Sequence, residues 1–366
     1  MAQSSFSFYQ QTWHRLKKNK LALAGLFIIL LSFLIAIFGY LLAPDDTPFA
    51  DMQTVEIQAK KPGYTQLFLQ IPQQNTSNES WLHRLFYGTR ATYSYLPISS
   101  YVIKKPILEV QKYVDEDTSV LQQFDLNQLT NNNPNSIQKQ LVTKKFWLGT
   151  DAFGRDILSR LLIGTRVSLA VGLIAVLISL TLGIVLGALA GYYRGWVDEI
   201  IMWLVNITWS IPTLLLVFAI TMALGKGFWQ IFIAVGLTMW VSVARLVRGQ
   251  VMAIKELEYV QAAKALGFTN ARIITRHILP NIMGPLMVIA AGNFATAIIV
   301  EAGLSFLGIG VQPPQPSWGL MIKENYNFII TNNPLLALIP GFAIMLLVLA
   351  FNLLGNGLRD AMDVRA

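Results

Sequence analysis

Residues 167–191 read VSLAVGLIAVLISLTLGIVLGALAG, and this stretch decides the fold. It holds no charged residue and is longer than the about 20 apolar residues that a helix needs to cross a lipid bilayer. A run of this kind is typical of a membrane-spanning helix. Gly183, Gly187 and Gly191 recur at every fourth position, so we expect one face of this helix to pack closely against a neighbouring helix.

Five further apolar stretches qualify as spans. They occupy residues 21–42, 200–224, 228–243, 282–304 and 335–354. The sequence therefore predicts six membrane-spanning helices. Pro212 and Pro285 fall inside two of them and predict kinks, because proline removes a backbone donor. We expect these kinks to be static features of packing.

The composition agrees with a membrane protein. Apolar residues make up 54% of the 366 residues and charged residues 13%, about half of the roughly 25% charged residues found in soluble domains. The chain has no cysteine, which excludes disulfides and thiol chemistry. Its three histidines, His14, His83 and His277, lie too far apart in the sequence to predict a metal site.

Charges outside the spans predict the orientation. The segment before the first span is basic and has no acidic residue, which places residues 1–20 in the cytoplasm. The first span is longer than the about 7–15 apolar residues of a signal peptide, so we interpret residues 21–43 as an uncleaved anchor. Residues 244–281 hold six basic and two acidic residues, whereas residues 45–145 hold ten of each.

This charge distribution places residues 244–281 and the tail 355–366 in the cytoplasm, with an insertion at residues 44–146 outside. It also accounts for the net charge of +8 without nucleic-acid binding. The insertion is polar, and short alternating pieces such as residues 65–71 predict strands. We expect it to form a small extracytoplasmic domain with an Asn-rich linker at residues 131–135.

No catalytic motif is present. The chain lacks Gly-x-Ser-x-Gly and His-Glu-x-x-His, and its glycine-rich stretches lack the Lys-Ser/Thr of a phosphate-binding loop. If ATP drives this protein, another chain must hydrolyse it.

The cytoplasmic segment 244–281 predicts two short helices. Residues 255–266 form the first, which ends at Gly267, and Thr269 or Asn270 begins the second, which Pro280 ends. The second helix places Ile273, Ile274 and Ile278 on one face, and the first exposes Ala262, Ala263 and Ala265. From these residues alone, docking of another protein and contact with lipid headgroups are equally supported.

The string YVQAAKALGFTNARIITRHILPN, residues 259–281, resembles the cytoplasmic loop of importer-type ATP-binding-cassette (ABC) permeases, above all the dipeptide/oligopeptide/nickel group. Gln261 stands where that family has Glu, and His277 where it has Ile. The resemblance implies that residues 255–281 form a coupling loop on which an ATPase subunit docks. The docking residues that it implies are Glu258, Tyr259, Gln261, Ala262, Ala263, Gly267, Arg276, Leu279 and Pro280.

Two other stretches are similar to the same group. Residues 148–169 read LGTDAFGRDILSRLLIGTRVSL, and residues 301–319 read EAGLSFLGIGVQPPQPSWG. Together the three motifs resemble the C-type permease subunit of oligopeptide and dipeptide importers. The insertion at residues 44–146 is the main departure, because this family's first outside loop is usually much shorter.

Four charged residues near the predicted outer ends of the spans are candidates for the pathway or its mouth: Asp151, Arg155, Asp156 and Glu301. The alternative is structural. Asp151 would cap a short interfacial helix, Asp156 would pair with Arg160 at i,i+4, and Trp318 would lie at headgroup depth.

The predicted fold is an all-α polytopic membrane protein of the type I ABC importer permease kind, with residues 147–366 as the permease core. The resemblance implies a non-enzymatic subunit that imports peptides across a bacterial inner membrane, with both termini cytoplasmic. Its partners would be a second permease, two ATPases that carry ATP and Mg²⁺, an external solute-binding protein and lipid. Transport of nickel or another small solute, a membrane-embedded hydrolase and a non-transporting scaffold are the alternatives.

Overall fold

The computed structural model describes residues 8–73, 80–129, 137–225, 227–331 and 333–362. The predicted linker at 131–135 lies outside these residues. The chain forms two compact units. The first comprises residues 1–33, 168–312 and 342–366, and the second residues 34–167 and 313–341.

Five helical segments among the described residues are long and apolar enough to cross a membrane. They are α2 (Lys20–Leu42), α6 (Ile157–Tyr193), α9 (Phe228–Lys255), the continuous segment Asn270–Phe306 and α14 (Leu335–Met362). A short helix, α1 (Phe8–Lys18), precedes α2. α6 and α9 run well beyond the spans predicted at residues 167–191 and 228–243. Arg160 in the extension of α6 pairs with Glu324, and Arg248 in that of α9 pairs with Asp198.

The predicted span at residues 200–224 is broken. It consists of α7 (Gly195–Ser210) and α8 (Thr213–Leu224), which meet at an angle of 98° and count as a sixth span only if taken together. The break falls at Pro212, as predicted, because proline forces the preceding residue out of the helical region. Ile211 accordingly has an extended backbone, with φ −95° and ψ 129°.

The prediction that Pro280 ends the second loop helix is wrong. The backbone stays helical through α11 (Asn270–Arg272), a π-helical turn η3 (Ile273–Ile278), a 3₁₀ turn η4 (Leu279–Ile282) and α12 (Met283–Phe306). Pro280 sits at the start of the 3₁₀ turn, where its missing N–H costs no helical hydrogen bond. The helix likewise continues through Pro285, in the first turn of α12.

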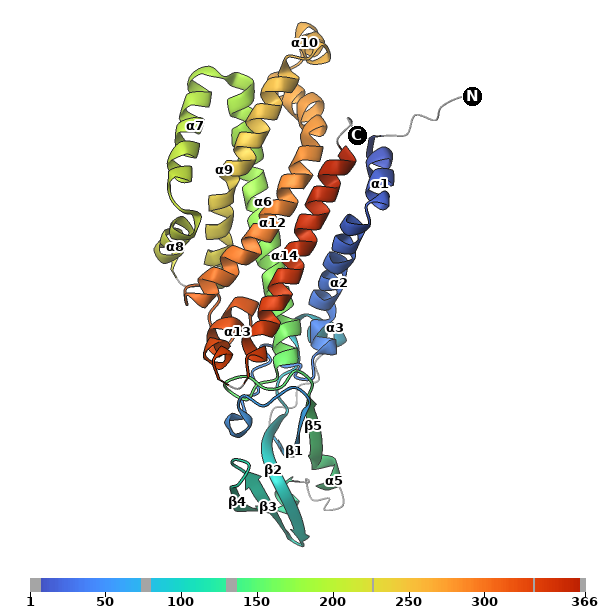
Figure 1. Cartoon of the computed structure of the whole chain (residues 1–366), viewed down its shortest axis with the longest axis vertical. Helices are drawn as coiled ribbons and strands as arrows, with labels where there is room; N and C mark the ends of the chain where they lie inside the picture. Colours follow the sequence, from blue (N-terminus) through green and yellow to red (C-terminus); the bar gives the residue numbers. More distant parts are fainter. Residues whose placement is uncertain (1–7, 74–79, 130–136, 226, 332, 363–366) are drawn as a thin grey trace, which may run out of the picture. The chain divides into compact units, whose positions relative to one another are not determined.

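Close contact between α6 and α9 holds the first unit together (Figure 1). A Cβ at Gly187 would lie 2.5 Å from the Ala244 carbonyl oxygen, and one at Gly191 would lie 2.7 Å from that of Arg248. Gly183 faces Val243 in the same way. The predicted close face is therefore confirmed.

The second unit contains a five-stranded antiparallel sheet with the order β4-β3-β2-β1-β5. Its strands are β1 (Tyr64–Pro72), β2 (Tyr93–Lys104), β3 (Ile107–Tyr113), β4 (Ser119–Asp125) and β5 (Leu141–Phe146). The strand predicted at residues 65–71 is confirmed. The prediction of an all-α chain needs correction, since the protein is mostly helical with one sheet.

Short helices complete the second unit. They are η1 (Val55–Ile57), α3 (Trp81–Tyr87), α4 (Leu126–Leu129), α5 (Ile137–Gln140), α13 (Trp318–Asn325) and η5 (Tyr326–Ile329). One face of the sheet buries Leu69, Ile98 and Leu108 against α4 and α5. A second cluster gathers Phe68 and Phe146 with Ile57.

We expect Gly187→Ala to destabilise the protein, because its methyl group must displace the α9 backbone. Overpacking of this kind costs about 1–3 kcal/mol. Thermal unfolding in detergent measures the effect. Gly249→Ala, in α9, is the matched control, because nothing lies within 4 Å of the added methyl and alanine favours a helix by up to about 1 kcal/mol. Equal unfolding temperatures for the two variants would contradict the role of the glycine face.

Candidate functional site

The predicted coupling loop, residues 255–281, contains α10 (Glu258–Ala265), which ends in a Schellman turn. Phe268 donates its N–H to the Ala263 carbonyl at 3.2 Å, and Gly267 donates to that of Lys264 at 3.0 Å. Gly267 has a φ of +79°, a conformation that glycine adopts without strain. The predicted glycine joint is therefore present in the backbone.

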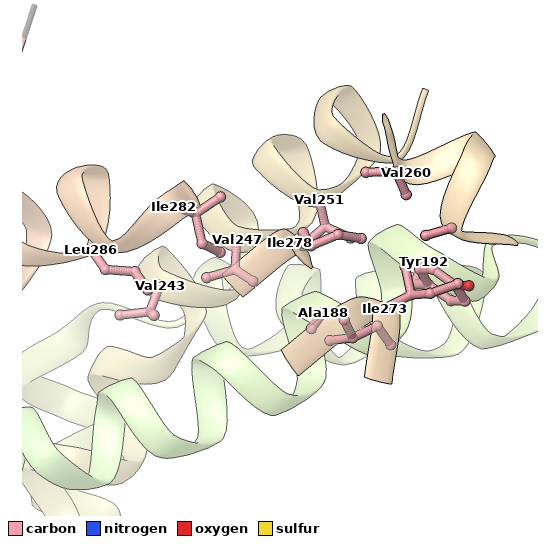
Figure 2. Close-up of a cluster of buried hydrophobic side chains, with 12 residues drawn as sticks. Ala188, Tyr192, Val243, Val247, Val251, Val260, Ile273, Ile278, Ile282 and Leu286 are labelled. Atoms are coloured by element: carbon pink, nitrogen blue, oxygen red, sulfur yellow. The ribbon is translucent and has the colours of Figure 1, made fainter. Parts of the chain in front are cut away.

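The underside of the coupling loop is apolar and buried (Figure 2). Val260 and Ala263 from α10 and three isoleucines from η3 pack against side chains of α6, α9 and α12. The cluster consists of Ala188, Tyr192, Val243, Val247, Val251, Val260, Ala263, Ile273, Ile274, Ile278, Ile282 and Leu286. The shared isoleucine face is confirmed. The exposed position predicted for Ala263 is wrong, because its helical phase turns it inward to 4% exposure.

Polar contacts fix the same loop to its neighbours. Lys255 donates from Nζ to the Tyr192 carbonyl at 2.8 Å, and the Tyr192 hydroxyl donates to Asn270 Oδ1 at 2.8 Å. Arg248 on α9 holds Asp198 on α7 through two contacts, of 2.5 and 2.6 Å. Tyr192 of α6 thus contacts both Lys255, at the end of α9, and Asn270 in the loop.

The outer face of the loop is exposed. Among the predicted docking residues, those with exposed side chains or backbone are Glu258, Tyr259, Gln261, Ala262, Gly267, Arg276 and Pro280, while Leu279 is half-buried. Leu266, which the sequence analysis passed over, is 75% exposed. The sequence could have indicated this exposure, because Leu266 directly precedes the glycine that ends α10. An apolar side chain at the end of a helix has no following turn to pack against.

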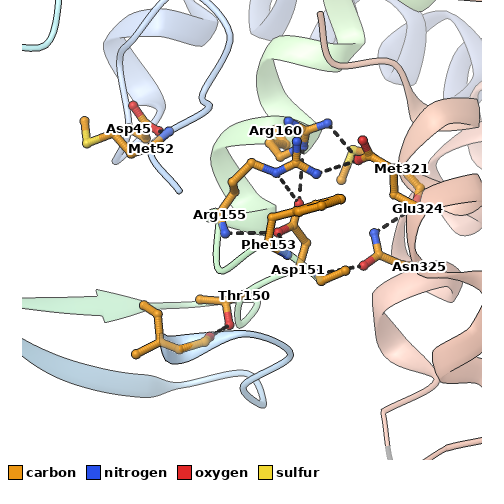
Figure 3. A network of polar contacts seen from close by, with 12 residues as sticks. Asp45, Met52, Thr150, Asp151, Phe153, Arg155, Arg160, Met321, Glu324 and Asn325 are labelled. Carbon is orange, nitrogen blue, oxygen red and sulfur yellow. Dashed lines mark hydrogen bonds and ion pairs between the residues drawn. The ribbon is translucent and has the colours of Figure 1, made fainter. Parts of the chain in front are cut away.

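The candidates Asp151 and Arg155 lie in a buried ion network of the second unit (Figure 3). Arg155 contacts Asp151 through Nε at 2.6 Å and Glu324 through NH2 at 2.6 Å. Arg160 contacts the same Glu324 at 3.1 Å, and Asn325 Oδ1 accepts from the Ala152 N–H at 3.1 Å. These contacts fasten the segment before α6 to α13.

Asp151 also caps the local turn, as the structural alternative predicted. Its Oδ1 accepts from the N–H groups of Phe153 at 2.9 Å and Arg155 at 3.0 Å. The predicted interfacial helix is wrong, because residues 149–156 form turns and the helix that follows is the start of α6. Glu324 escaped the sequence analysis, since a lone carboxylate far along the chain carries no pattern.

Asp156 stands apart from this network. The predicted Asp156–Arg160 pair is wrong, because Arg160 turns to Glu324 while Asp156 Oδ2 accepts from the N–H of Ser159 at 2.8 Å and from its hydroxyl. Asp156 therefore caps the start of α6. Burial raises the pKa of its carboxyl, an effect that the bonds from Ser159 partly offset.

Glu301 belongs to the first unit, in α12, and is fully buried. Its Oε1 accepts from the Ser305 hydroxyl at 2.7 Å, and Ser305 Oγ accepts from the Val311 N–H at 3.0 Å. It thus supports the turn that follows α12.

Trp318, for which a headgroup position was predicted, packs inside the protein. Its side chain is 4% exposed and donates from Nε1 to the Leu161 carbonyl at 3.0 Å. The indole N–H therefore has a protein partner within the second unit.

Two family models match the chain. The model of the binding-protein-dependent transport system inner membrane component matches residues 183–366, and the N-terminal transmembrane domain of oligopeptide transport permease C matches residues 7–62. The chain belongs to this permease family. It is thus a C-type permease subunit of an ABC importer, a membrane component without its own enzymatic activity, and the prediction from the three motifs is confirmed.

Curated relatives agree. The dipeptide transport permease DppC of Bacillus subtilis (strain 168) is 33% identical over 98% of this chain and 86% of its own length. The glutathione transport permease GsiD of Pectobacterium atrosepticum is 43% identical over 59% of this chain and 72% of its own. The solved MetNI methionine transporter matches at a TM-score of 0.45 and 19% identity, over 55% of this chain and 96% of the matched chain.

We expect Glu324→Gln to destabilise the second unit, because Arg155 and Arg160 would then share one carboxylate. Breaking a buried ion pair costs up to about 3–5 kcal/mol. Thermal unfolding of the purified chain checks this. Glu116→Gln is the control, since its carboxylate is 82% exposed and a surface pair contributes about 0–1 kcal/mol. A Glu324 variant as stable as the control would show that the network contributes nothing.

Proposed function

We propose that this permease subunit imports short peptides across a bacterial cytoplasmic membrane and that ATPase subunits dock on its coupling loop. The observation that supports the proposal is how that loop packs against the helices of the first unit. Its underside is buried on α6 and α9, while Glu258, Tyr259 and Leu266 face outward. Because the underside of the loop is packed against these helices, a displacement of the loop displaces the helices with it.

The proposed mechanism follows from this arrangement. ATP and Mg²⁺ bind to two partner ATPases, whose closure moves α10. Because Val260 and Ile278 pack against Val251, a displacement of α10 is passed to α9, and through the glycine contacts to α6. A second permease subunit encloses the path, and a solute-binding protein delivers the cargo from outside. In this proposal Asp151, Arg155, Asp156 and Glu301 support the pathway mouth and the turns beside it.

Peptides are the proposed cargo because relatives of this chain are named as dipeptide and glutathione transport permeases. The proposed domain arrangement places residues 1–20 and 244–281 in the cytoplasm. Residues 21–43 are the first span, residues 147–366 the permease core, and residues 44–146 lie outside.

We expect Leu266→Asp to abolish coupling without unfolding the chain, because Leu266 is 75% exposed and touches little of its own protein. Proteoliposomes with the partner subunits should lose at least about tenfold in ATP-dependent dipeptide uptake, as expected for loss of an interface anchor. ATPase co-purification should fall with it.

Val120→Asp, on the sheet, is the matched control, since Val120 is 49% exposed and lies outside the loop. Undiminished uptake and co-purification of the Leu266 variant would contradict the docking surface. If the wild-type assembly hydrolysed ATP and moved nickel but no dipeptide, the proposed cargo would be wrong while the docking assignment stood.

The orientation is open to a direct measurement because the chain has no cysteine. We expect Ser119→Cys, on the exposed strand β4, to react with a membrane-impermeant maleimide applied to intact spheroplasts. Ala265→Cys, on the exposed side of α10, should react only after permeabilisation. The cysteine-free chain gives the background. The opposite labelling pattern would refute the orientation.

A further inference from the structure

A cavity of about 220 Å³ lies within the second unit, away from the coupling loop. Strand β5, strand β2 and the turn before α6 contribute to its walls. The lining residues that carry charge are Asp45, Asp156, Lys144 and Lys145, and those that carry aromatic rings are Phe68, Tyr95 and Phe146. The cavity is a mixed charged and aromatic site on the inserted domain.

One carboxylate at this cavity is incompletely satisfied. Asp156 is 6% exposed, and its Oδ2 accepts two hydrogen bonds from Ser159. Its buried Oδ1 has no hydrogen-bond partner among the described residues. Asp45 differs, because it accepts from the N–H and hydroxyl of Thr47 and from the N–H of Met52. A buried carboxylate oxygen without a donor is costly, so Asp156 is the group that needs a ligand.

A half-buried ammonium, that of Lys144, lies at the same cavity. Lys144 Nζ lies 3.2 Å from the centroid of the Tyr95 ring, and no hydrogen bond to Nζ is found within the described part of the chain. Burial lowers the pKa of this ammonium, an effect that the negative charges of Asp45 and Asp156 oppose. Lys144 therefore interacts electrostatically with the carboxylate of Asp156 but donates no hydrogen bond to it.

These two groups are complementary to the two ends of a small zwitterion. We propose that the cavity binds a molecule with a free primary ammonium and a free carboxylate, the ammonium on Asp156 Oδ1 and the carboxylate on Lys144. The four charged lining residues, Asp45, Asp156, Lys144 and Lys145, together carry no net formal charge, as suits a zwitterion. The rings of Phe68, Tyr95 and Phe146 line the same cavity, and aromatic rings attract ammonium groups in cation–π sites.

The volume limits the ligand. A cavity of about 220 Å³ has room for about seven waters at about 30 Å³ each and is smaller than the about 300–1,000 Å³ of sites for drug-sized ligands. An amino acid or a dipeptide is of the right class. The proposal concerns the inserted domain and does not rest on peptide transport.

Titration calorimetry of the full-length chain in nanodiscs, without partner subunits, tests the proposal with diglycine as the probe. We expect saturable binding that weakens at least tenfold in Asp156→Asn. Glu116→Gln, whose exposed carboxylate lies outside the cavity, should bind as the wild type does. N-acetyl-diglycine, which lacks the ammonium, should bind at least tenfold more weakly to the wild type.

A second variant tests the binding of the ligand's carboxylate separately from that of its ammonium. Lys144→Met should weaken diglycine at least fivefold and leave glycylglycinamide, which lacks the carboxylate, within twofold. This comparison within one variant remains informative if Asp156→Asn fails to fold. Absence of saturable diglycine binding to folded wild-type chain, equal binding of the acetylated probe, or equal effects of Lys144→Met on both probes would each overturn the proposal. Because no ATPase is present, a failure of transport leaves this result unaffected.

Discussion

The close approach of α6 and α9 at Gly187 and Gly191 determines where the loop of the first unit packs. The backbones of the two helices approach closely, since a single Cβ at either glycine would lie within 2.7 Å of an α9 carbonyl oxygen. The same two helices then carry Tyr192 and Val251, which receive the underside of the coupling loop. Helix contact and loop placement therefore depend on one constraint, and a change in helix spacing would also change the seat of α10.

This dependence gives the irregular backbone of the loop a physical reason. A Schellman turn at Gly267 reverses the chain after α10, and the π-helical turn η3 brings Ile273, Ile274 and Ile278 onto the buried cluster. π-Helical turns are rare and occur mostly as single turns inside α-helices. Here the backbone stays helical past Pro280, so that Asn270–Phe306 forms one continuous helical segment.

Sequence reasoning succeeded where a local pattern carries the information. The positions of the spans, the glycine face, the break at Pro212 and the strand at residues 65–71 all follow from periodicity or from the backbone of one residue type. It failed where a distant partner decides. The helical phase of Ala263 depends on α6, and the role of Arg160 depends on Glu324, far away in sequence. The early start of α6 was missed for the same reason, because Arg160 looks unsuited to a buried helix until its partner is known.

Buried charges in the second unit are of two kinds, and the difference separates structural from functional roles. Arg155 contacts both Asp151 and Glu324 at 2.6 Å, and these contacts fasten the turn before α6 to α13. Asp156 and Lys144 lie at one cavity and form no direct pair. Because desolvated charges are costly unless they are compensated, a chain that needed only stability would have joined them or replaced them with apolar residues. Their separation is the observation on which the ligand proposed for this cavity rests.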